Sequence, residues 1–278
     1  MLIKNNIINQ VNAKMGGINF NIDLYNAKFN KNNFIFLIIG LTSKTNQGKI
    51  IYSMTSSTNK YLNEIKTQIK EIIYNNKKNA LKEMFNNTLK YFEEKNNKIS
   101  PDYIIIYREG GNEYKNKCIT IDEVNIFTDK MKELKSNNLY LNTKLYFICA
   151  NLKAELKFYH IKEKHVFGNP QSGIIVDEDV VQKDRYEFYL QSQLVSQGTA
   201  NPILFQVMYY EKNENNPNED LSQDNLEKLT FYLSFYYWTL EGAVRIPALL
   251  KMAITALDFC IKCNIINDIS FFEKPIYI

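Results

Sequence analysis

The chain has 278 residues, of which 45% are hydrophobic, and it carries 34 basic against 30 acidic residues. This length and composition predict a substantial core in one large or two small domains, and they exclude a disordered chain. A net charge of +4 provides no bulk positive field, so a nucleic-acid partner would need a local basic groove.

The apolar runs and the cysteines indicate the cellular compartment of the protein. The longest apolar run, residues 34–39, is too short to cross a bilayer. Four scattered cysteines do not make a disulfide framework, which favours a reducing compartment. Cys260 and Cys263 form a C-x-x-C motif, but no second pair exists, so an apolar helix end is favoured over a metal site. We therefore expect a soluble intracellular protein of the cytoplasm or nucleus.

The first part of the chain predicts a helix, three strands and a second helix. Residues 1–15 have helical apolar spacing that ends at Gly16. β-Branched and apolar runs predict three strands in hairpin order, at 34–41, 49–56 and 60–69. An amphipathic pattern predicts a helix over residues 80–94.

Residues 101–111 form the most informative stretch, in which a proline opens and two glycines close an aromatic and β-branched run. This pattern is typical of a buried central strand in an α/β sheet. Such sheets place their chemistry at the carboxyl ends of the strands, which here means Arg108, Glu109 and the two glycines. The alternative is a core strand followed by a solvated turn.

The rest of the chain alternates helices with short strands. The predicted helices are 121–134, 222–238 and 248–263, and the predicted strands are 145–150, 157–161, 173–176, 188–191 and 203–209. Residues 213–220 predict an exposed loop. Together these elements predict a mixed α/β sheet in one domain.

Nine short stretches carry a family likeness through their order and spacing. They are residues 10–17, 39–40, 101–110, 146–159, 173–177, 186–191, 197–199 with Pro202, 229–230 and 245–248. Together they resemble the Piwi domain of the Argonaute/Piwi family, and within it the Piwi branch. The resemblance implies a ribonuclease-H-like mixed sheet flanked by helices over residues 1–278, and residues 1–17 would be the end of a MID-like segment.

The resemblance also implies a function. The family holds a small guide RNA that selects complementary transcripts for silencing, with further proteins as partners. The family's amino-terminal and PAZ modules, and most of its MID module, have no counterpart in these residues. Either this protein is a reduced Piwi module or the sequence is incomplete.

Family members that cut RNA resemble two-metal nucleases, in which clustered carboxylates hold paired divalent ions. The four matching positions here are Thr42, Asn79, Glu109 and Ile254. The strand that ends at Gly40 and the strand that ends at Arg108 are expected to be neighbours, so Thr42 and Glu109 should lie close together at one edge of the sheet. Only Glu109 keeps an acid, and its arm is one methylene longer than the aspartate of the family. We therefore expect no catalytic residues and no cleavage, unless the register is different and another acid, such as Glu71 or Asp258, takes part.

The residues that would hold the guide are better preserved. In the Piwi branch, a lysine and a magnesium ion bind the guide 5′ phosphate, and the ion is coordinated by a glutamine and the terminal carboxylate. Gln10, Lys14 and Ile278 match these three groups, so the resemblance implies Mg²⁺ held by Gln10 and Ile278. The alternative is that Gln10 and Lys14 form only the polar face of a surface helix.

Three further cations match or lie near the guide path of the family, namely Lys153, Lys157 and Arg245. They predict contacts with the RNA backbone, although an ordinary solvated charge set would look the same. Trp238 and tyrosines 232, 236 and 237 could stack on bases, but their helical spacing favours core packing.

The leading hypothesis is a Piwi-like protein that binds a small RNA through its 5′ phosphate without cutting its target. The alternatives are an active divalent-metal endoribonuclease and a protein-interaction remnant that has lost RNA binding. Divalent-dependent cleavage would select the first alternative. Failure to bind 5′-phosphorylated RNA would select the second.

Overall fold

The structure is a computed structural model of the chain. It describes residues 2–22, 24, 33–72, 76–110, 113–163, 166–182, 185–212, 221–265, 270–272 and 274–278. Among these residues, no helix is long and apolar enough to cross a membrane.

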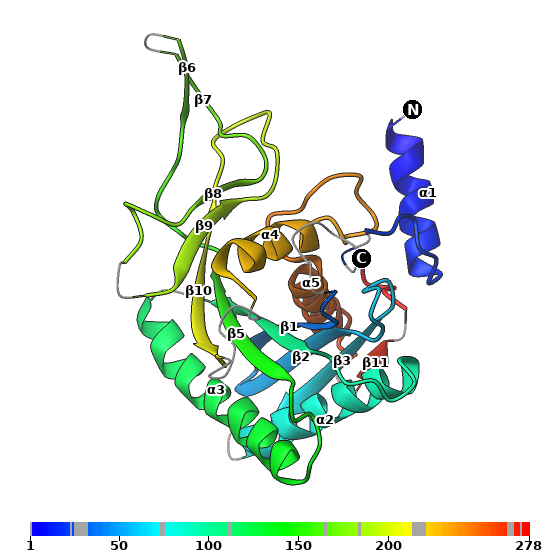
Figure 1. The fold of residues 1–278 in the computed structure, drawn as a ribbon. Helices are drawn as coiled ribbons and strands as arrows, with labels where there is room; N and C mark the ends of the chain where they lie inside the picture. The colour runs from blue at the N-terminus through cyan, green and yellow to red at the C-terminus, as the bar shows by residue number, and fades with distance from the viewer. Residues whose placement is uncertain are drawn as a thin grey trace.

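The described elements alternate along the chain as a mixed α/β protein (Figure 1). The helices are α1 (Leu2–Lys14), α2 (Lys77–Lys95), α3 (Glu113–Ser136), α4 (Gln223–Leu233) and α5 (Ala248–Cys263). The strands are β1 (Phe36–Asn46), β2 (Lys49–Ser57), β3 (Ile65–Ile72), β4 (Tyr103–Gly110), β5 (Lys144–Asn151), β6 (His160–Glu163), β7 (Val166–Gly168), β8 (Ile174–Val176), β9 (Glu187–Gln191), β10 (Ile203–Tyr210) and β11 (Ser270–Phe272).

One nine-stranded sheet organises the molecule, in the order β11-β3-β2-β1-β4-β5-β10-β9-β8. Its centre is parallel, because β4 pairs in parallel with both β1 and β5. The flanking pairs are antiparallel, including the β1-β2-β3 hairpins. Strands β6 and β7 form a separate two-stranded ribbon. The predicted mixed sheet is therefore confirmed, with the strand over residues 103–110 at its centre.

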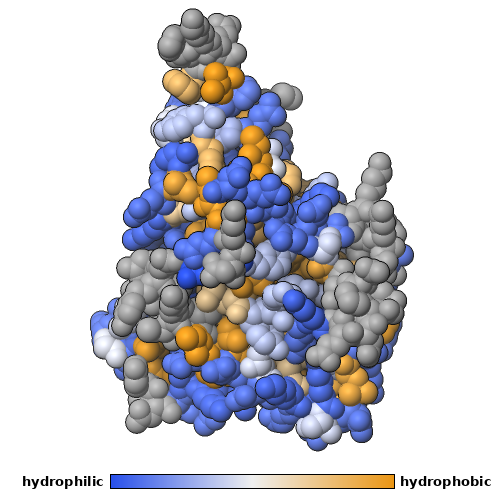
Figure 2. Space-filling model, turned by 60° about the vertical axis from the view of Figure 1, so that its left-hand side comes forward, coloured by the Kyte–Doolittle hydropathy of each residue, from blue (hydrophilic) through white to orange (hydrophobic). Residues whose placement is uncertain are grey.

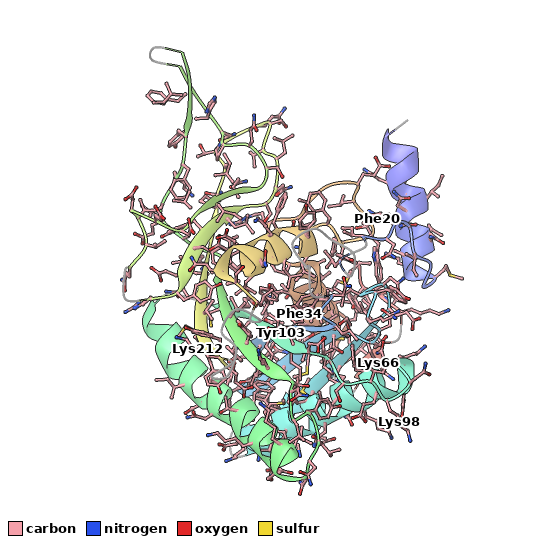
Figure 3. All side chains as sticks on the ribbon, in the orientation of Figure 1. Phe20, Phe34, Lys66, Lys98, Tyr103 and Lys212 are labelled. Atoms are coloured by element: carbon pink, nitrogen blue, oxygen red, sulfur yellow. The ribbon has the colours of Figure 1, made fainter. Side chains whose placement is uncertain are left out.

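Two apolar cores cover the two faces of the sheet, and they follow from side-chain alternation along the strands. Ile38 and Ile105 face α4 and α5, whereas Ile39 and Ile106 face α2 and α3. Figure 1 shows the two pairs of helices on opposite sides of the sheet. Phe34 and Tyr103 lie together (Figure 3), with ring centroids 4.9 Å apart in an edge-on arrangement.

Several predicted boundaries are wrong, and long-range contacts explain two of them. β3 begins at Ile65 and not at residue 60, because a turn precedes it in which the Asn96 side chain accepts from Lys60 N at 2.9 Å and donates to Thr58 O. Helix α4 ends at Leu233 and not at residue 238, since the chain continues in turns stabilised by Ser234 N donating to Phe231 O at 3.0 Å.

The remaining differences concern short or extended elements. β6 begins at His160 and not at residue 157, and α3 begins at Glu113, eight residues before the predicted start. The three-residue strands β7 and β11 were not predicted. The predicted loop over residues 213–220 lies outside the described residues.

The aromatic residues at and after the end of α4 are buried in the core as predicted, with one exception. Tyr236, Tyr237 and Trp238 are buried in the core beside α5, as predicted. Tyr232 is 39% exposed, so the prediction is wrong for that residue. Its place on the last turn of α4 leaves part of the ring in solvent.

Candidate functional site

The carboxyl end of β4 and the adjacent part of β1 bring together two residues that the sequence placed at a common edge, although β1 continues beyond the predicted residue 41 to Asn46. β1 and β4 are parallel neighbours in which Leu41 pairs with Arg108. One residue further along, the Thr42 hydroxyl donates a hydrogen bond to the Glu109 carboxylate. The predicted proximity of Thr42 and Glu109 is therefore confirmed, and both side chains lie on the face covered by α5.

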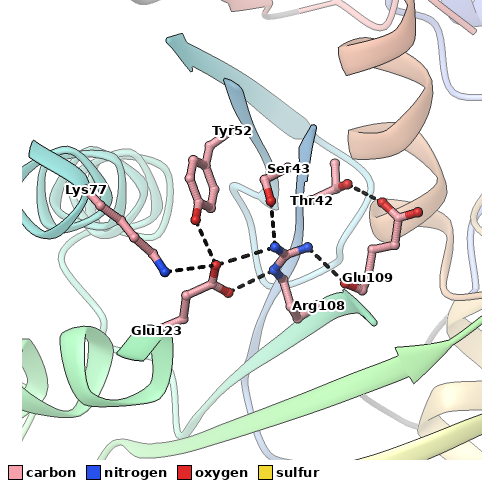
Figure 4. Close-up of polar contacts among 7 residues, drawn as sticks. All are labelled: Thr42, Ser43, Tyr52, Lys77, Arg108, Glu109 and Glu123. Carbon is pink, nitrogen blue, oxygen red and sulfur yellow. Dashed lines mark hydrogen bonds and ion pairs between the residues drawn. The ribbon is translucent and has the colours of Figure 1, made fainter. Parts of the chain in front are cut away.

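The opposite face of the same strand ends carries a buried charge network (Figure 4). Arg108 Nε donates to Glu123 Oε2 at 2.8 Å, and Arg108 Nη2 donates to Ser43 Oγ at 2.7 Å. The Tyr52 hydroxyl donates to Glu123 Oε1 at 2.9 Å, and Lys77 Nζ lies 3.7 Å from the same oxygen. The network therefore links β1, β2, β4, α2 and α3.

Burial and charge together determine the protonation states of the side chains in this network. Arg108 is 4% exposed and Glu123 is fully buried. Burial alone would lower the pKa of Arg108, but the Glu123 carboxylate more than reverses this effect, so the pKa is raised. Burial and the same carboxylate raise the pKa of Tyr52. The guanidinium and the phenol therefore stay protonated, and both donate to Glu123.

A backbone contact connects the two faces. Arg108 Nη1 donates to the carbonyl oxygen of Glu109 at 2.9 Å. The buried network thus fixes the main chain at the end of β4, from which the Glu109 side chain points to Thr42 on the other face. Arg108 acts here as a positioning residue.

Helix α5 runs along β1 on the face that holds Thr42. A Cβ atom on Gly40 would lie 2.4 Å from the backbone of Leu249 and Leu250, so the helix start touches the strand. Two turns later, Asp258 forms an ion pair with Lys44. Ile254 lies on α5 between these two contacts, and its partly buried side chain packs against the apolar core on this face.

Asn79, the fourth position of this set, does not join Thr42 and Glu109. It is exposed in the first turn of α2, the helix that covers the opposite face of the sheet. The two acids considered as substitutes each form an ion pair with a lysine, Glu71 with Lys49 at 2.6 Å and Asp258 with Lys44. In the described part of the chain, no group of three or more His, Cys, Asp or Glu side chains is placed to hold a metal ion.

The far side of the molecule brings α1 against the carboxyl-terminal segment. Gln10 and Lys14 are four residues apart on α1, and both are exposed. Just beyond the helix, a Cβ atom on Gly16 would lie 3.3 Å from Lys274 Cγ. Ile278 is half-buried. Convergence of Gln10, Lys14 and the Ile278 carboxylate on one pocket stays a prediction.

Side-chain contacts anchor both of these segments to the body. Asn19 Nδ2 donates to Asn9 O at 2.8 Å and to Trp238 O at 2.6 Å, which ties α1 to the turns after α4. The buried Tyr277 hydroxyl lies 2.6 Å from the Thr67 hydroxyl on β3. A cavity of about 400 Å³ lies beside both segments. Gly16 and Lys274 line it together with residues of β3 and of the end of α2, such as Lys66 and Tyr91.

The three cations proposed for the RNA backbone lie on neighbouring segments. Lys153 and Lys157 are exposed in the segment that follows β5, and Lys157 bonds to the Asn201 side chain. Arg245 Nη2 donates to Leu152 O at 3.2 Å, directly before Lys153. The Arg245 Nε atom is buried without a partner, and burial lowers the pKa of this side chain.

Sequence reasoning missed two residues that build these sites. Glu123 is the buried counter-ion of Arg108, but a glutamate in an amphipathic helix usually indicates a solvated face. Asn19 follows two glycines and reads as a loop residue, although it links α1 to Trp238. A local pattern carries no signal for either contact, because the partners are distant in sequence.

The comparisons with known proteins agree with this geometry. A family model described as the Piwi domain matches residues 1–258, so the chain belongs to the Piwi domain family. Protein argonaute-3 of Drosophila melanogaster is 27% identical over 283 residues, covering 98% of this chain and 29% of the relative. Human Piwi-like protein 3 is 28% identical over 154 residues, covering 55% of this chain and 16% of the relative. The chain thus spans about a third or less of these relatives.

Solved structures show the same fold. The crystal structure of Drosophila Piwi matches with a TM-score of 0.74 at 22% identity, covering 99% of this chain and 36% of that chain. The crystal structure of Kluyveromyces polysporus Argonaute with a guide RNA matches with a TM-score of 0.76 at 18% identity, and the match covers 93% of this chain and 30% of that chain. The fold is therefore that of a ribonuclease-H-like Piwi domain.

Proposed function

We propose that this chain is the Piwi domain of a small-RNA-guided silencing protein that binds its guide through the 5′ phosphate and leaves the target RNA uncut. Membership in the Piwi domain family supports the general function. The proposed absence of cleavage rests on one observation, the hydrogen bond between Thr42 of β1 and Glu109 near the end of β4. A neutral hydroxyl there donates to the single carboxylate.

Two-metal hydrolysis needs several anionic ligands around one phosphodiester, because two divalent ions must be held and partly neutralised. At the matching positions, Thr42 and Asn79 are neutral, and Ile254 has no ligand atom. Glu109 alone supplies one negative charge. The chemistry of this donor set does not fit a pair of divalent ions, so no hydrolytic step is assigned to it.

Guide binding is supported by the arrangement at α1. Gln10 and Lys14 share a helical face, and the helix ends against the carboxyl-terminal segment at Gly16 and Lys274. An amide oxygen of Gln10 and the Ile278 carboxylate are hard oxygen ligands that suit Mg²⁺, and the ion would neutralise part of the phosphate charge. Lys14 would add a charge-assisted contact.

A cleavage assay tests the proposed inactivity. The protein is loaded with a 5′-phosphorylated guide and incubated with labelled complementary RNA in Mg²⁺ or Mn²⁺. We expect the target to stay intact. Cutting at one phosphodiester that Glu109→Ala abolishes would select the active endoribonuclease instead.

A binding series tests the guide site. Charge-assisted hydrogen bonds contribute roughly 1.5–3 kcal/mol, so Lys14→Ala should weaken guide binding about tenfold or more. Residues added after Ile278 should also weaken binding, because they remove the carboxylate from its place. Lys49→Ala is the control, since Lys49 lies at the β1–β2 hairpin and forms an ion pair with Glu71 of β3. Equal effects of Lys14→Ala and Lys49→Ala would contradict the site.

A further inference from the structure

The ribbon of β6 and β7 projects away from the main sheet (Figure 1). In its register, Ile161 pairs directly with Phe167, so these two side chains point to the same face of the ribbon. Tyr159 precedes Ile161 by two residues, and its ring centroid lies 6.5 Å from that of Phe167 in an edge-on arrangement. The three side chains therefore form one surface, which we call the ribbon face.

The ribbon face is open to solvent. Tyr159 is 54% exposed, Ile161 is 66% exposed and Phe167 is 64% exposed. Figure 2 shows apolar side chains on this projecting part of the molecule, among hydrophilic ones. Contiguous apolar side chains that stay exposed on a folded domain are typical of a surface that binds a partner.

The base of the ribbon, in contrast, is firmly attached to the body. Phe158 packs edge-on against Tyr189 of β9, with ring centroids 5.4 Å apart. After β7, Asn169 Nδ2 donates to Val195 O at 3.0 Å and to Gly198 O at 2.8 Å, and Asn169 Oδ1 accepts from Ala200 N. These contacts tie the segments that enter and leave the ribbon to the body of the domain.

The lysines beside the ribbon face favour a negatively charged partner. Among the described side chains just before the ribbon, Lys153 and Lys157 are exposed and flank one exposed glutamate, Glu155, which leaves a small surplus of positive charge there. Lys157, one of the proposed backbone cations, is exposed two residues before Tyr159. Exposed aromatic rings beside cations are the combination that binds single-stranded nucleic acid, in which bases stack on rings and phosphates meet ammonium groups.

We infer that the ribbon face stacks an unpaired base of the RNA whose backbone passes Lys157, with Tyr159 and Phe167 as the stacking residues. This inference rests on the proposed function. The alternative partner, a protein surface that covers the same face, is an outcome of the test.

The test places the fluorescent base 2-aminopurine at successive positions of a 5′-phosphorylated single-stranded RNA. Stacking on an aromatic ring quenches this base, so wild-type protein should change the fluorescence at one position or at two neighbouring positions. Tyr159→Ala with Phe167→Ala should abolish that change and weaken binding by about tenfold, the size of one lost base stack. Tyr159→Phe keeps a stacking ring and should retain the change.

Tyr61→Ala is the matched control, because Tyr61 is 49% exposed in the turn between β2 and β3. It should leave both the fluorescence profile and the affinity unchanged. Anisotropy on the same samples reports RNA binding separately. RNA that binds with no position sensitive to the double variant would overturn the inference, would leave the proposed function standing and would point to a protein partner. RNA that does not bind at all would overturn both.

Discussion

Arg108 and Glu123 show how single residues determine the geometry of the strand ends. Their ion pair is buried, and its hydrogen bonds reach Ser43, Tyr52 and the Glu109 carbonyl. Removing one member of such a pair leaves an uncompensated buried charge, which costs more than the intact pair contributes.

Glu123→Ala should therefore lower the free energy of unfolding by about 3–5 kcal/mol. Denaturant unfolding of the two proteins measures this difference. Asp129→Ala is the control, because its ion pair with Lys78 is exposed on both sides and should contribute at most about 1 kcal/mol. Similar losses in the two variants would show that Arg108 has an alternative partner.

Glu227 on α4 is a residue whose protonation state should change as the pH approaches neutrality. It is buried, and desolvation raises its pKa from 4.5 to about 7, while a hydrogen bond from Gln223 opposes the shift. The folded protein therefore binds a proton that the unfolded chain releases between pH 4.5 and 7. Stability should fall as the pH rises through this window.

Glu227→Gln keeps the acceptor for Gln223 and removes the charge. The variant should be more stable than the wild type above pH 7, by an amount on the order of 2 kcal/mol, and the difference should vanish near pH 4.5. Thermal unfolding at both pH values measures this. A difference that is constant with pH would mean that Glu227 keeps the same protonation state throughout.

The contact between α5 and β1 governs the arrangement at the scale of elements. Gly40 lets the first turn of α5 approach the strand, because any Cβ atom there would meet the backbone of Leu249 and Leu250 at 2.4 Å. Backbone atoms cannot move aside as a flexible side chain can. The helix would have to shift as a whole, and Ile254 and Asp258 would shift with it.

Gly40→Ala should accordingly destabilise the protein by about 1–3 kcal/mol or more, the usual cost of overpacking. Gly242→Ala is the matched control, since no atom lies within 4 Å of a Cβ atom placed there. Melting temperatures of the two variants give the comparison. A stable Gly40→Ala protein would mean that the helix and strand are not in contact.

The sequence predicted the presence of most helices and strands more accurately than the residues at which they begin and end. The apolar and β-branched run before Arg108 predicted the central strand, and pairing with β1 followed from the family likeness. The end of α4 was missed because apolar spacing continues into Tyr236 and Trp238, which pack into the core from turns. The short strands β7 and β11 exist only through their pairing partners, which local pattern does not show.

The candidate sites were predictable to different degrees. The proximity of Thr42 and Glu109 could be predicted because the apolar and β-branched runs before them read as two neighbouring core strands, although β1 continues past Thr42 to Asn46. The buried role of Glu123 could not, since its partners lie on β2, β4 and α2. Whether Gln10, Lys14 and Ile278 form one pocket depends on side-chain positions at an exposed helix face, where packing imposes little constraint.

The whole molecule has a small net charge of +4, so the proposed RNA binding would have to come from local groups and not from a general positive field. Gln10 and Lys14 lie on α1, and Lys153, Lys157 and Arg245 lie along the segments after β5 and before α5. A guide fixed at its 5′ end on α1 would have these cations available further along its backbone. Specific recognition should therefore centre on the terminal phosphate.

The most direct measurement compares the affinities of the wild-type protein for one RNA with a 5′ phosphate and for the same RNA with a 5′ hydroxyl. We predict that the phosphorylated RNA binds about tenfold or more tightly, and that Lys14→Ala removes most of this difference. Equal affinities for the two RNAs would contradict guide recognition through the 5′ phosphate and would favour a protein-interaction role for this Piwi domain.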